Sequence, residues 1–408
     1  MITTASVMRV LVFEAQTGGH YLHWAGVLGA ALSELGVLVT VALSRDAPGT
    51  ASFRHHIEPF SHLFELDTAS PPSLPGTWNG ARSRIEAIRG ALKRSGANRL
   101  YLPTADGVAQ SLGAATLLGM RPLGGVAAEA LMMNGAVAHL KGLTTLRARQ
   151  HLSYKLARSG PWSNFFHLNP LVHEWEASIG VKENERVLTM PEPIERAPGF
   201  GTAKARKTFN LEPSSTYLGM VGRIDKRKGA DLLVEALSHP RMPSDVQLVL
   251  FGSFSPEVAQ LVRESPVRDR IVMRDEIISD EELLLTLEAL DLVVLPYRGV
   301  VSSSGLMARA VACGRPVLTT GGGWGEHMNQ LFKFGWTIPQ ATPPAIAENI
   351  ARVLDSAKKW TASEESRRFI EYNSVANFAA HWCRGLREEL KMEPCRDLKS
   401  WSWAIEGF

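Results

Sequence analysis

Short apolar runs alternate with amphipathic segments along the first half of the chain. Residues 10–13, 37–43, 100–102, 164–168 and 186–188 are typical of buried strands. Apolar residues recur at helical spacing from Trp24 to Leu35, where Gly36 ends the pattern, and a second helix is predicted over 82–94. The Pro/Ser/Gly-rich residues 70–80 predict a surface loop between them. This alternation of strands and helices indicates a doubly wound domain.

The same alternation restarts after a stretch rich in proline and glycine. Strands are predicted at 217–221, 246–251, 271–273, 292–295 and 316–319, and helices near 345–354 and from 363 towards 390. Ser279 and Glu282 form a capping-box pattern, which predicts a helix starting at Asp280. Trp401 and Trp403 predict that the tail packs against a domain, because large aromatic side chains are seldom left in water.

The pattern therefore predicts an α/β chain of two Rossmann-like doubly wound domains that face each other across a cleft. We expect the first domain over 1–195, a linker over 196–214 and the second domain over 215–375. Residues 376–408 should form a C-terminal helix and tail that pack back on the domains.

A basic loop follows the first strand of the second half. Residues 221–229 read V-G-R-I-D-K-R-K-G, so a strand ends at Gly222 and a helix begins after Gly229. Open α/β sheets bind ligands beyond the carboxyl ends of their strands. Arg223 offers a planar fork and Lys228 a point charge, a pair suited to a diphosphate. The alternative is that both are solvated cations, one of them neutralised by Asp225.

A second segment of this kind follows the predicted strand 292–295. Residues 302–305 read S-S-S-G and lead directly into a helical pattern. Small residues at a helix start let backbone N–H groups approach an anion, although serines there are equally well explained as N-caps. Two such segments after strands of one sheet indicate a shared ligand that bears phosphate.

Composition excludes several classes of protein. Apolar content of 45%, charged content of 21% and a net charge of +3 over 408 residues are those of a globular protein, and no dense basic run predicts nucleic-acid binding. The three cysteines have no metal-ligand spacing and cannot form a complete disulfide framework. The N-terminal apolar run is too short for a signal peptide, and no run is long enough for a membrane span. We expect a cytoplasmic protein, with peripheral attachment to the inner face of the membrane as an alternative.

With these motifs in order, the chain resembles the glycosyltransferases of the GT-B fold, in the retaining family-4-like group. Residues 221–229 resemble the family's G-R-x-x-x-x-K-G, and L-P-Y at 295–297, A-C-G-R-P-V at 312–317 and G-G-W-G-E at 322–326 fall at the matching places. M-P-E-P at 190–193 lies where the family leaves its first domain. The resemblance implies donor contacts from Gly222, Arg223, Lys228, Ile278, Ser303, Ser304, Gly305, Leu306 and Glu326, and an acceptor loop at Gly18, Gly19 and His20.

One departure from the family pattern concerns its two glutamates, which lie eight positions apart. The matching positions here are Val301 and Arg309, so the segment is a degenerate version of E-x7-E. Neither side chain can accept a hydrogen bond from a hydroxyl. Arg309 is either a third phosphate ligand or an outward-facing helix residue, and we expect the latter. Glu326 either replaces a hydroxyl contact or is an ordinary acid in the first turn of a helix.

The chemistry that the resemblance implies is transfer of a sugar from a UDP- or GDP-linked donor to a saccharide or lipid-linked acceptor, with retention. Arg223 and Lys228 would stabilise the leaving diphosphate, so we expect no metal and no cofactor; no Asp-x-Asp occurs in the chain. His20 and Asp106 follow predicted strands and are the candidate polar groups near the acceptor. The alternatives are a helix-start histidine satisfied locally and an N-cap aspartate.

Residues 141–158 form a basic segment that bears on the acceptor. On a helix Arg147, His151, Lys155 and Arg158 would share one face, with three leucines, Leu146, Leu152 and Leu156, on another. Such a helix either contacts an anionic membrane or is simply a solvated surface. Membrane contact would indicate a lipid-linked acceptor.

Two other functions stay open at this point. Loss of the glutamates favours a catalytically silent relative that binds a nucleotide or a glycan as a partner subunit. A nucleotide-sugar epimerase on the same double-domain fold would isomerise the donor without an acceptor.

Overall fold

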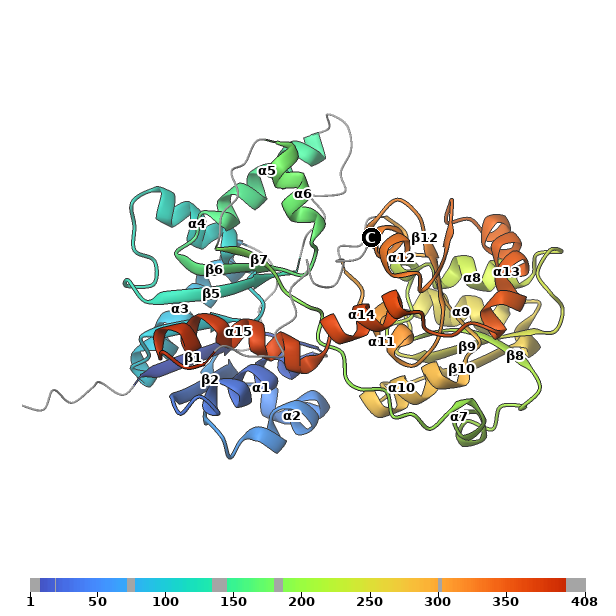
Figure 1. Cartoon of the computed structure of the whole chain (residues 1–408), viewed down its shortest axis with the longest axis horizontal. Coiled ribbons are helices and arrows are strands. Elements are labelled where there is room, and N and C mark those ends of the chain that lie inside the picture. Colours follow the sequence, from blue (N-terminus) through green and yellow to red (C-terminus); the bar gives the residue numbers. More distant parts are fainter. Residues whose placement is uncertain are drawn as a thin grey trace, which may run out of the picture. The chain divides into compact units, whose positions relative to one another are not determined.

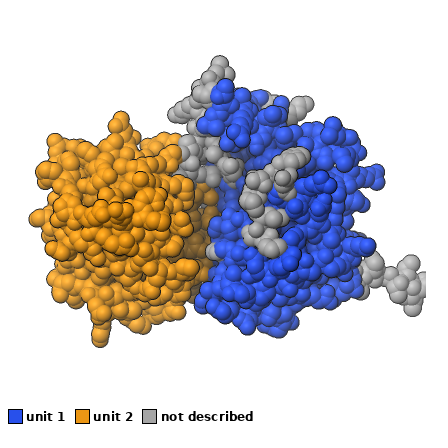
Figure 2. Space-filling view, turned by 180° about the vertical axis from the view of Figure 1, so that it is seen from behind, with its two compact units in different colours: residues 1–191, 375–398 blue, residues 192–374, 399–408 orange. Residues whose placement is uncertain are grey.

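The structure is a computed structural model that describes residues 8–18, 20–71, 78–133, 145–179, 186–299 and 303–393, except the side chains of Trp78, Asn79 and Arg147. Its contacts divide the chain into two compact units (Figure 2). The first unit comprises Met1–Pro191 with Val375–Leu398, and the second comprises Glu192–Ser374 with Lys399–Phe408. The chain therefore leaves the first unit at Pro191, four residues before the expected boundary at 195. The predicted packing of Trp401 and Trp403 lies outside the described residues.

The first unit is built on a parallel sheet of seven strands in the order β3-β2-β1-β4-β5-β6-β7 (Figure 1). The strands are β1 (Arg9–Glu14), β2 (Leu38–Ser44), β3 (Glu65–Ser70), β4 (Arg99–Leu102), β5 (Ala127–Met132), β6 (Trp162–His167) and β7 (Val187–Thr189). Its helices are α1 (His20–Ser33), α2 (Ala51–His56), α3 (Trp78–Ser95), α4 (Ala109–Leu117), α5 (Thr145–Arg158), α6 (Leu171–Ser178) and α15 (Val375–Glu389).

Strand β1 shows why helices cover both faces of this sheet. Its side chains alternate between two apolar clusters, because successive residues of a strand point to opposite faces. Val10 and Val12 pack with apolar residues of α1 and α15, whereas Leu11 and Phe13 pack with those of α3, α4 and α5. The strand is therefore apolar from Val10 to Phe13, as expected for a parallel sheet buried on both sides.

The second unit repeats the plan with six parallel strands in the order β10-β9-β8-β11-β12-β13. They are β8 (Thr216–Val221), β9 (Val246–Gly252), β10 (Ile271–Asp275), β11 (Leu292–Leu295), β12 (Val317–Thr320) and β13 (Gly335–Ile338). Helix α8 (Ala230–Leu237) contacts both α9 (Pro256–Glu264) and α13 (Pro343–Lys358). The other helices form a second row in which each contacts the next, in the order α7 (Thr202–Thr208), α10 (Asp280–Ala289), α11 (Gly305–Ala312), α14 (Glu364–Tyr372) and α12 (Trp324–Phe332).

The single helical stretch predicted from 363 towards 390 is two helices, α14 and α15, which belong to different units. Asn373 lies between the two helices. It also binds residues 192–194, where the chain first passes from one unit to the other. Its side-chain oxygen accepts a hydrogen bond from the Glu192 N–H at 2.8 Å, and its carbonyl accepts one from Ile194 at 2.8 Å. The two segments that connect the units are thus paired with each other.

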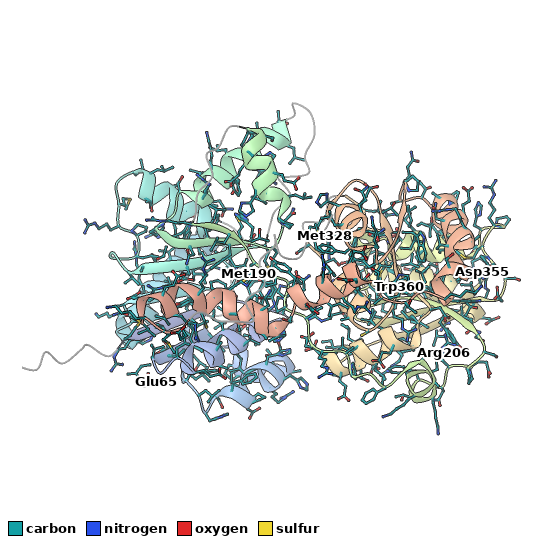
Figure 3. The ribbon with its side chains drawn as sticks, in the orientation of Figure 1. Glu65, Met190, Arg206, Met328, Asp355 and Trp360 are labelled. Carbon is teal, nitrogen blue, oxygen red and sulfur yellow. The ribbon has the colours of Figure 1, made fainter. Side chains whose placement is uncertain are left out.

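Residues 196–214 are not a free linker, because they are part of the second unit. Arg206 of α7 (labelled in Figure 3) is buried and donates to the carbonyls of Ala289 and Pro213 at 3.0 and 2.7 Å. It also pairs with Asp291 at 2.8 Å. Glu288 accepts hydrogen bonds from two backbone N–H groups of this stretch, those of Gly199 and Gly201. The polar side chains of α10 and its end fix a segment that has little apolar periodicity of its own.

None of the helices that the structure describes is both long enough and apolar enough to cross a bilayer.

Candidate functional site

Each sheet has one place where the strand order reverses direction, and the predicted loops follow the strands at that place. In the second unit β8 lies between β9 and β11, and in the first unit β1 lies between β2 and β4. Open α/β sheets bind ligands in the crevice outside the carboxyl ends of two such strands. The basic loop follows β8 and the Ser/Gly segment follows β11, so both lie at the reversal point of the second sheet.

The backbone of the basic loop, residues 222–229, is held in place by hydrogen bonds. Gly222 has a φ of +89°, and Ile224 donates to the carbonyl of Ser253 at 2.9 Å. Asp225 caps the 3-10 turn Lys226–Lys228 by accepting the Lys228 N–H at 2.9 Å. Asp225 thus has a structural role, and its carboxylate lies 3.8 Å from the Arg223 Nε, a distance at which it neutralises the arginine only weakly.

The two cations of this loop differ in burial. The Arg223 side chain is 61% exposed, whereas Lys228 is half-buried. The Lys228 Nζ lies 3.9 Å from the place that a Cβ on Gly222 would occupy, so it extends over the end of β8. Burial and, to a smaller extent, the neighbouring Arg227 together lower the Lys228 pKa to about 8. An ammonium whose charge is costly in this way is stabilised by any anion that binds next to it.

The start of α11 is joined to the basic loop through Tyr297 and Arg298, which follow Pro296 at the end of β11. Ser304 is the N-cap of α11 and accepts the Met307 N–H at 3.3 Å, and its hydroxyl lies 2.8 Å from the Tyr297 hydroxyl. The next residue, Arg298, donates its backbone N–H to the carbonyl of Arg227 at 3.0 Å. The structure therefore brings the two predicted segments together, and the N-cap alternative for Ser304 is correct as well.

Arg309 is not the outward-facing helix residue that we expected. Its side chain is only 13% exposed and makes two hydrogen bonds to Glu195, at 2.8 and 3.0 Å. Glu192 lies beside the same guanidinium; burial raises its pKa, and Arg309 and the Ser303 hydroxyl oppose that rise. Two carboxylates from the start of the second unit thus surround the charge that stands at a glutamate position of the family. Val301 lies outside the described residues.

Glu326 and Ile278 are two further residues that we predicted to contact the nucleotide-sugar. Glu326, in the first turn of α12, accepts the backbone N–H of Gly322 at 2.6 Å. Its carboxylate therefore holds the glycine loop after β12, as the first-turn alternative implies. Ile278 is half-buried in the loop after β10, beside Ile277, which is 87% exposed. An apolar side chain that exposed is available to a flat ligand surface.

In the first unit the reversal point holds a polar cluster around Glu14, which sequence reasoning missed. Glu14 ends β1, is 2% exposed and accepts hydrogen bonds from the Thr104 hydroxyl and from the Gln16 N–H, the latter at 2.8 Å. Burial raises its pKa to about 7. The charges of Glu14 and Asp106 both raise the pKa of Tyr21, after burial, so these three groups share one region. A polar residue directly after an apolar strand was the signal available in the sequence.

The predicted acceptor residues lie at this same edge. His20 is the first residue of α1 and is exposed, with its ring 4.2 Å from that of Tyr21 and 4.8 Å from that of Trp24. Asp106 is not an N-cap, because Val108 holds that place; its carboxylate accepts the Met133 N–H at 2.9 Å. Gly18 precedes α1, and Gly19 lies outside the described residues.

Two of the four residues predicted for the basic face of α5 are engaged with other residues of the first unit. His151 packs 4.5 Å from the Trp175 ring, and Arg158 pairs with Glu176 at 2.8 Å, so both contribute to packing of the first unit. Leu152, by contrast, is 60% exposed and has the exposed Lys155 on the same helix. Residues 141–144 and the Arg147 side chain lie outside the described part.

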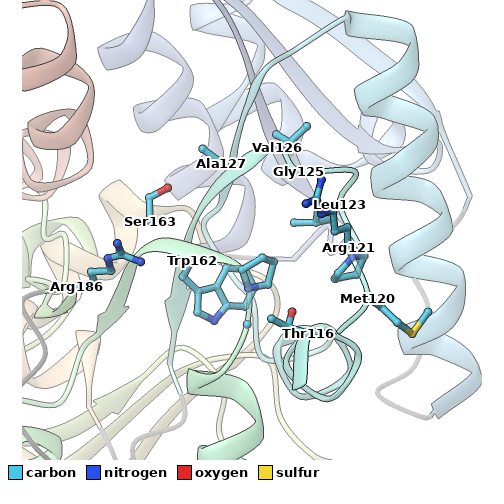
Figure 4. Close-up of a pocket in the computed structure, with 13 residues that line it drawn as sticks. Thr116, Met120, Arg121, Leu123, Gly125, Val126, Ala127, Trp162, Ser163 and Arg186 are labelled. Carbon is cyan, nitrogen blue, oxygen red and sulfur yellow. The ribbon is translucent and has the colours of Figure 1, made fainter. Parts of the chain in front are cut away.

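A hollow of about 540 Å³ lies at the opposite edge of the first sheet (Figure 4). Ala127 and Trp162 are the first residues of β5 and β6, and Arg121 and Arg186 flank Trp162 there. The hollow is thus at the amino ends of the strands, away from the loops described above, and we assign it no part in the chemistry proposed below.

Residues 215–356 match the model of the family described as "Glycosyl transferases group 1". Within the curated proteins, the chain is 33% identical over 147 residues to D-inositol 3-phosphate glycosyltransferase of Pseudarthrobacter chlorophenolicus, a match that covers 33% of this chain and 34% of that one. It is 28% identical over 182 residues to glycogen synthase of Moorella thermoacetica, covering 43% and 37%. The chain thus matches about a third of the length of these relatives.

The fold as a whole has solved counterparts. Sucrose-phosphate synthase from Thermosynechococcus elongatus superposes with a TM-score of 0.73 at 17% identity, over 94% of this chain and 99% of that one. HepE of Anabaena, solved in complex with UDP and glucose, gives 0.67 at 13% identity over 93% and 100%. The predicted GT-B fold and the predicted resemblance to group 1 glycosyl transferases are therefore confirmed.

Proposed function

We propose that this chain, whose residues 215–356 match the group 1 glycosyl transferases, transfers a sugar from a nucleotide-diphosphate donor to an acceptor that carries a hydroxyl. The observation that carries the proposal is the junction of the basic loop with the start of α11 at the reversal point of the second sheet. Arg223, Lys228 and the first N–H groups of α11 would then face the same diphosphate.

The chemistry required of these residues is charge stabilisation. As the bond between the sugar and the diphosphate breaks, negative charge grows on the leaving oxygen, and two cations beside it lower the barrier. We propose a UDP- or GDP-linked donor and transfer with retention, assisted by no metal and no organic cofactor. Ile278 and its neighbour Ile277 would contact the base, and Gly222, Ser303, Ser304, Gly305 and Leu306 would line the phosphates. Glu326 would shape the adjoining glycine loop.

The acceptor would bind at the reversal point of the first sheet. His20 and Asp106 are retained as its candidate polar groups, with Gly18 and Gly19 directly before His20 in the sequence. A saccharide or lipid-linked acceptor fits these groups, because both offer hydroxyls to carboxylate and imidazole partners. Orientation of that hydroxyl is the contribution we assign to this unit.

We further propose contact of α5 with an anionic membrane, which would place the protein at the cytoplasmic face. Exposed Leu152 and Lys155 combine apolar area with positive charge. Leu152→Ser/Lys155→Glu should reduce sedimentation with vesicles that contain anionic lipid by several fold, since each cation contributes about 1 kcal/mol. Lys359→Glu, an exposed charge reversal in the second unit, is the matched control. Equal sedimentation of all three proteins would remove the membrane proposal.

The experiment for the transferase is a donor turnover assay. UDP-, GDP- and ADP-glucose are incubated with the protein, with and without a saccharide acceptor, and released diphosphate and products are measured. We expect release of the nucleoside diphosphate together with transfer of the sugar to the acceptor. NMR of the anomeric proton should show that the product has the same anomeric configuration as the donor. A protein that binds a donor without turnover is the silent relative, which the absence of acids at Val301 and Arg309 favours. Isomerised donor without acceptor would identify an epimerase.

A further inference from the structure

A carboxylate from outside α11 lies at the start of that helix. Built on Gly305, a Cβ would lie 2.8 Å from the Glu192 Oε1 and 2.7 Å from the Arg309 Nη1. Both charged groups therefore lie directly against the first residue of α11, and a larger residue there would require them to move. The Ser303 hydroxyl also hydrogen-bonds the Glu192 carboxylate.

The backbone of Glu192 is held independently of its side chain. Its N–H donates to the Asn373 side chain at 2.8 Å, and Ile194 forms a bridge with Ser374. The carboxylate is thus presented from a fixed segment. Arg309 makes two hydrogen bonds to Glu195 and also compensates the negative charge of Glu192. An anion bound at the start of α11 would therefore meet a carboxylate that is already paired with a cation.

The hydrogen-bonding capacity of this place determines what can bind. Among the described residues, none accepts the N–H groups of Gly305 and Leu306, which are free to bind phosphate oxygens. An ionised carboxylate only accepts hydrogen bonds, as do phosphate oxygens. Glu192 therefore cannot bind the phosphate itself, but it can bind a hydroxyl group that is attached next to it.

We propose that Glu192 accepts a hydrogen bond from a hydroxyl of the nucleotide-sugar, either on the ribose or on the transferred sugar. This inference rests on the function proposed above. The chain would thereby supply from the segment after β7 the carboxylate that its α11 segment lacks at Val301 and Arg309.

Calorimetric titration of the full chain tests this inference. Wild type, Glu192→Gln and the matched control Glu195→Gln are titrated with the nucleoside diphosphate that wild type binds among UDP, GDP and ADP. Its 2′,3′-dideoxy form and its glucose conjugate complete the set. Glutamine keeps the size and a hydrogen-bond acceptor but loses the charge, and thermal denaturation checks that both variants fold.

Glu192→Gln should weaken binding about ten- to hundredfold, the range for a hydrogen bond to a charged group. If the partner is on the ribose, the loss affects the diphosphate and its conjugate but not the dideoxy form. If it is on the transferred sugar, only the conjugate loses affinity. Glu195→Gln should retain affinity for all three ligands.

Unchanged binding of every ligand by Glu192→Gln would overturn the inference. Equal losses for both variants, including losses with the dideoxy form, would also overturn it, because they would mean that the cluster only stabilises α11. If Glu192→Gln fails to fold, Glu192→Asp takes its place in the titrations. Its shorter side chain should not reach the hydroxyl, so the same ligands should lose affinity. If wild type binds no diphosphate, the proposed function itself fails.

Discussion

A Cβ on Gly229 would lie 2.1 Å from the carbonyl oxygen of Pro296, so the end of the basic loop packs directly against the end of β11. Gly229 also has a φ of +75°, a conformation that favours glycine. This contact between two chain segments holds the predicted phosphate ligands of two adjacent strands in one place.

Gly229→Ala should therefore destabilise the second unit by more than the backbone conformation alone explains. Left-handed backbone costs an alanine about 1 kcal/mol, and the clash adds at least about 1–2 kcal/mol. Gly314→Ala is the control, because Gly314 has a φ of +69° and no atom within 4 Å of a Cβ. Chemical denaturation measures both variants. Equal losses would show that Gly229 does not pack tightly on Pro296.

The pH dependence of diphosphate binding should reveal Lys228. Its pKa of about 8 in the free protein will rise when a diphosphate binds, because the anion favours the charged form. Above pH 8 a proton must then be taken up on binding, so affinity should fall as the pH rises from 8 to 9.5. Lys228→Arg, which stays charged over this range, should show a flatter profile in the same titrations. Parallel profiles would mean that Lys228 does not face the ligand.

Restoring the family's acid at position 309 should harm this chain. Arg309→Glu would place a third carboxylate beside Glu192 and Glu195 and break a pair that is largely buried. Removing one partner of such a pair costs about 3–5 kcal/mol. The exchange Arg309→Glu/Glu195→Arg should recover part of the loss. Denaturant unfolding of both variants gives the free energies; a single variant as stable as wild type would contradict the pairing.

Glu14→Gln should make the first unit less sensitive to pH. Because its pKa is raised from 4.5 to about 7, folded Glu14 keeps a proton that the unfolded chain loses between these pH values. The free energy of unfolding therefore falls as the pH rises from 4.5 to 7, by up to about 3 kcal/mol from this group. Glutamine does not titrate, so the variant should lose less stability between pH 5 and 8. Part of the pH dependence of stability should remain in the variant, because burial also raises the pKa of Glu129 to about 7. An unchanged slope would show that Glu14 is ionised in the fold.

Apart from β5, which was not predicted, the sequence predicted the central strands well, because those strands are continuous apolar runs with clear ends. Residues 292–295 are the bounds of β11, which lies between Asp291 and Pro296. Two of the four edge strands were missed: β3 reads E-L-D-T-A-S and has one buried residue, and β13 is short, whereas the edge strands β7 and β10 were predicted. Strand β5, A-A-E-A-L-M, consists of good helix formers, so its environment overrides local propensity.

The candidate site was predictable only where it is local in sequence. Arg223, Lys228 and Ser304 lie in the segments that follow β8 and β11, and the order of the strands brings these segments together. The pairing of Arg309 with Glu195 spans 114 residues, and nothing in either neighbourhood predicts it. Arg309 was therefore predicted to face solvent, although in the structure its charge pairs with Glu195 inside the fold.

Calorimetric titration of UDP, GDP and ADP, into wild type and into Arg223→Ala/Lys228→Ala, tests the diphosphate site most directly. Each charge-assisted contact is worth about 1.5–3 kcal/mol, so removal of both side chains should weaken binding at least about a hundredfold. Binding of one diphosphate by wild type, lost in the double variant, is the predicted result. Binding of equal strength in both proteins, or no binding by wild type at millimolar concentration, would contradict the account.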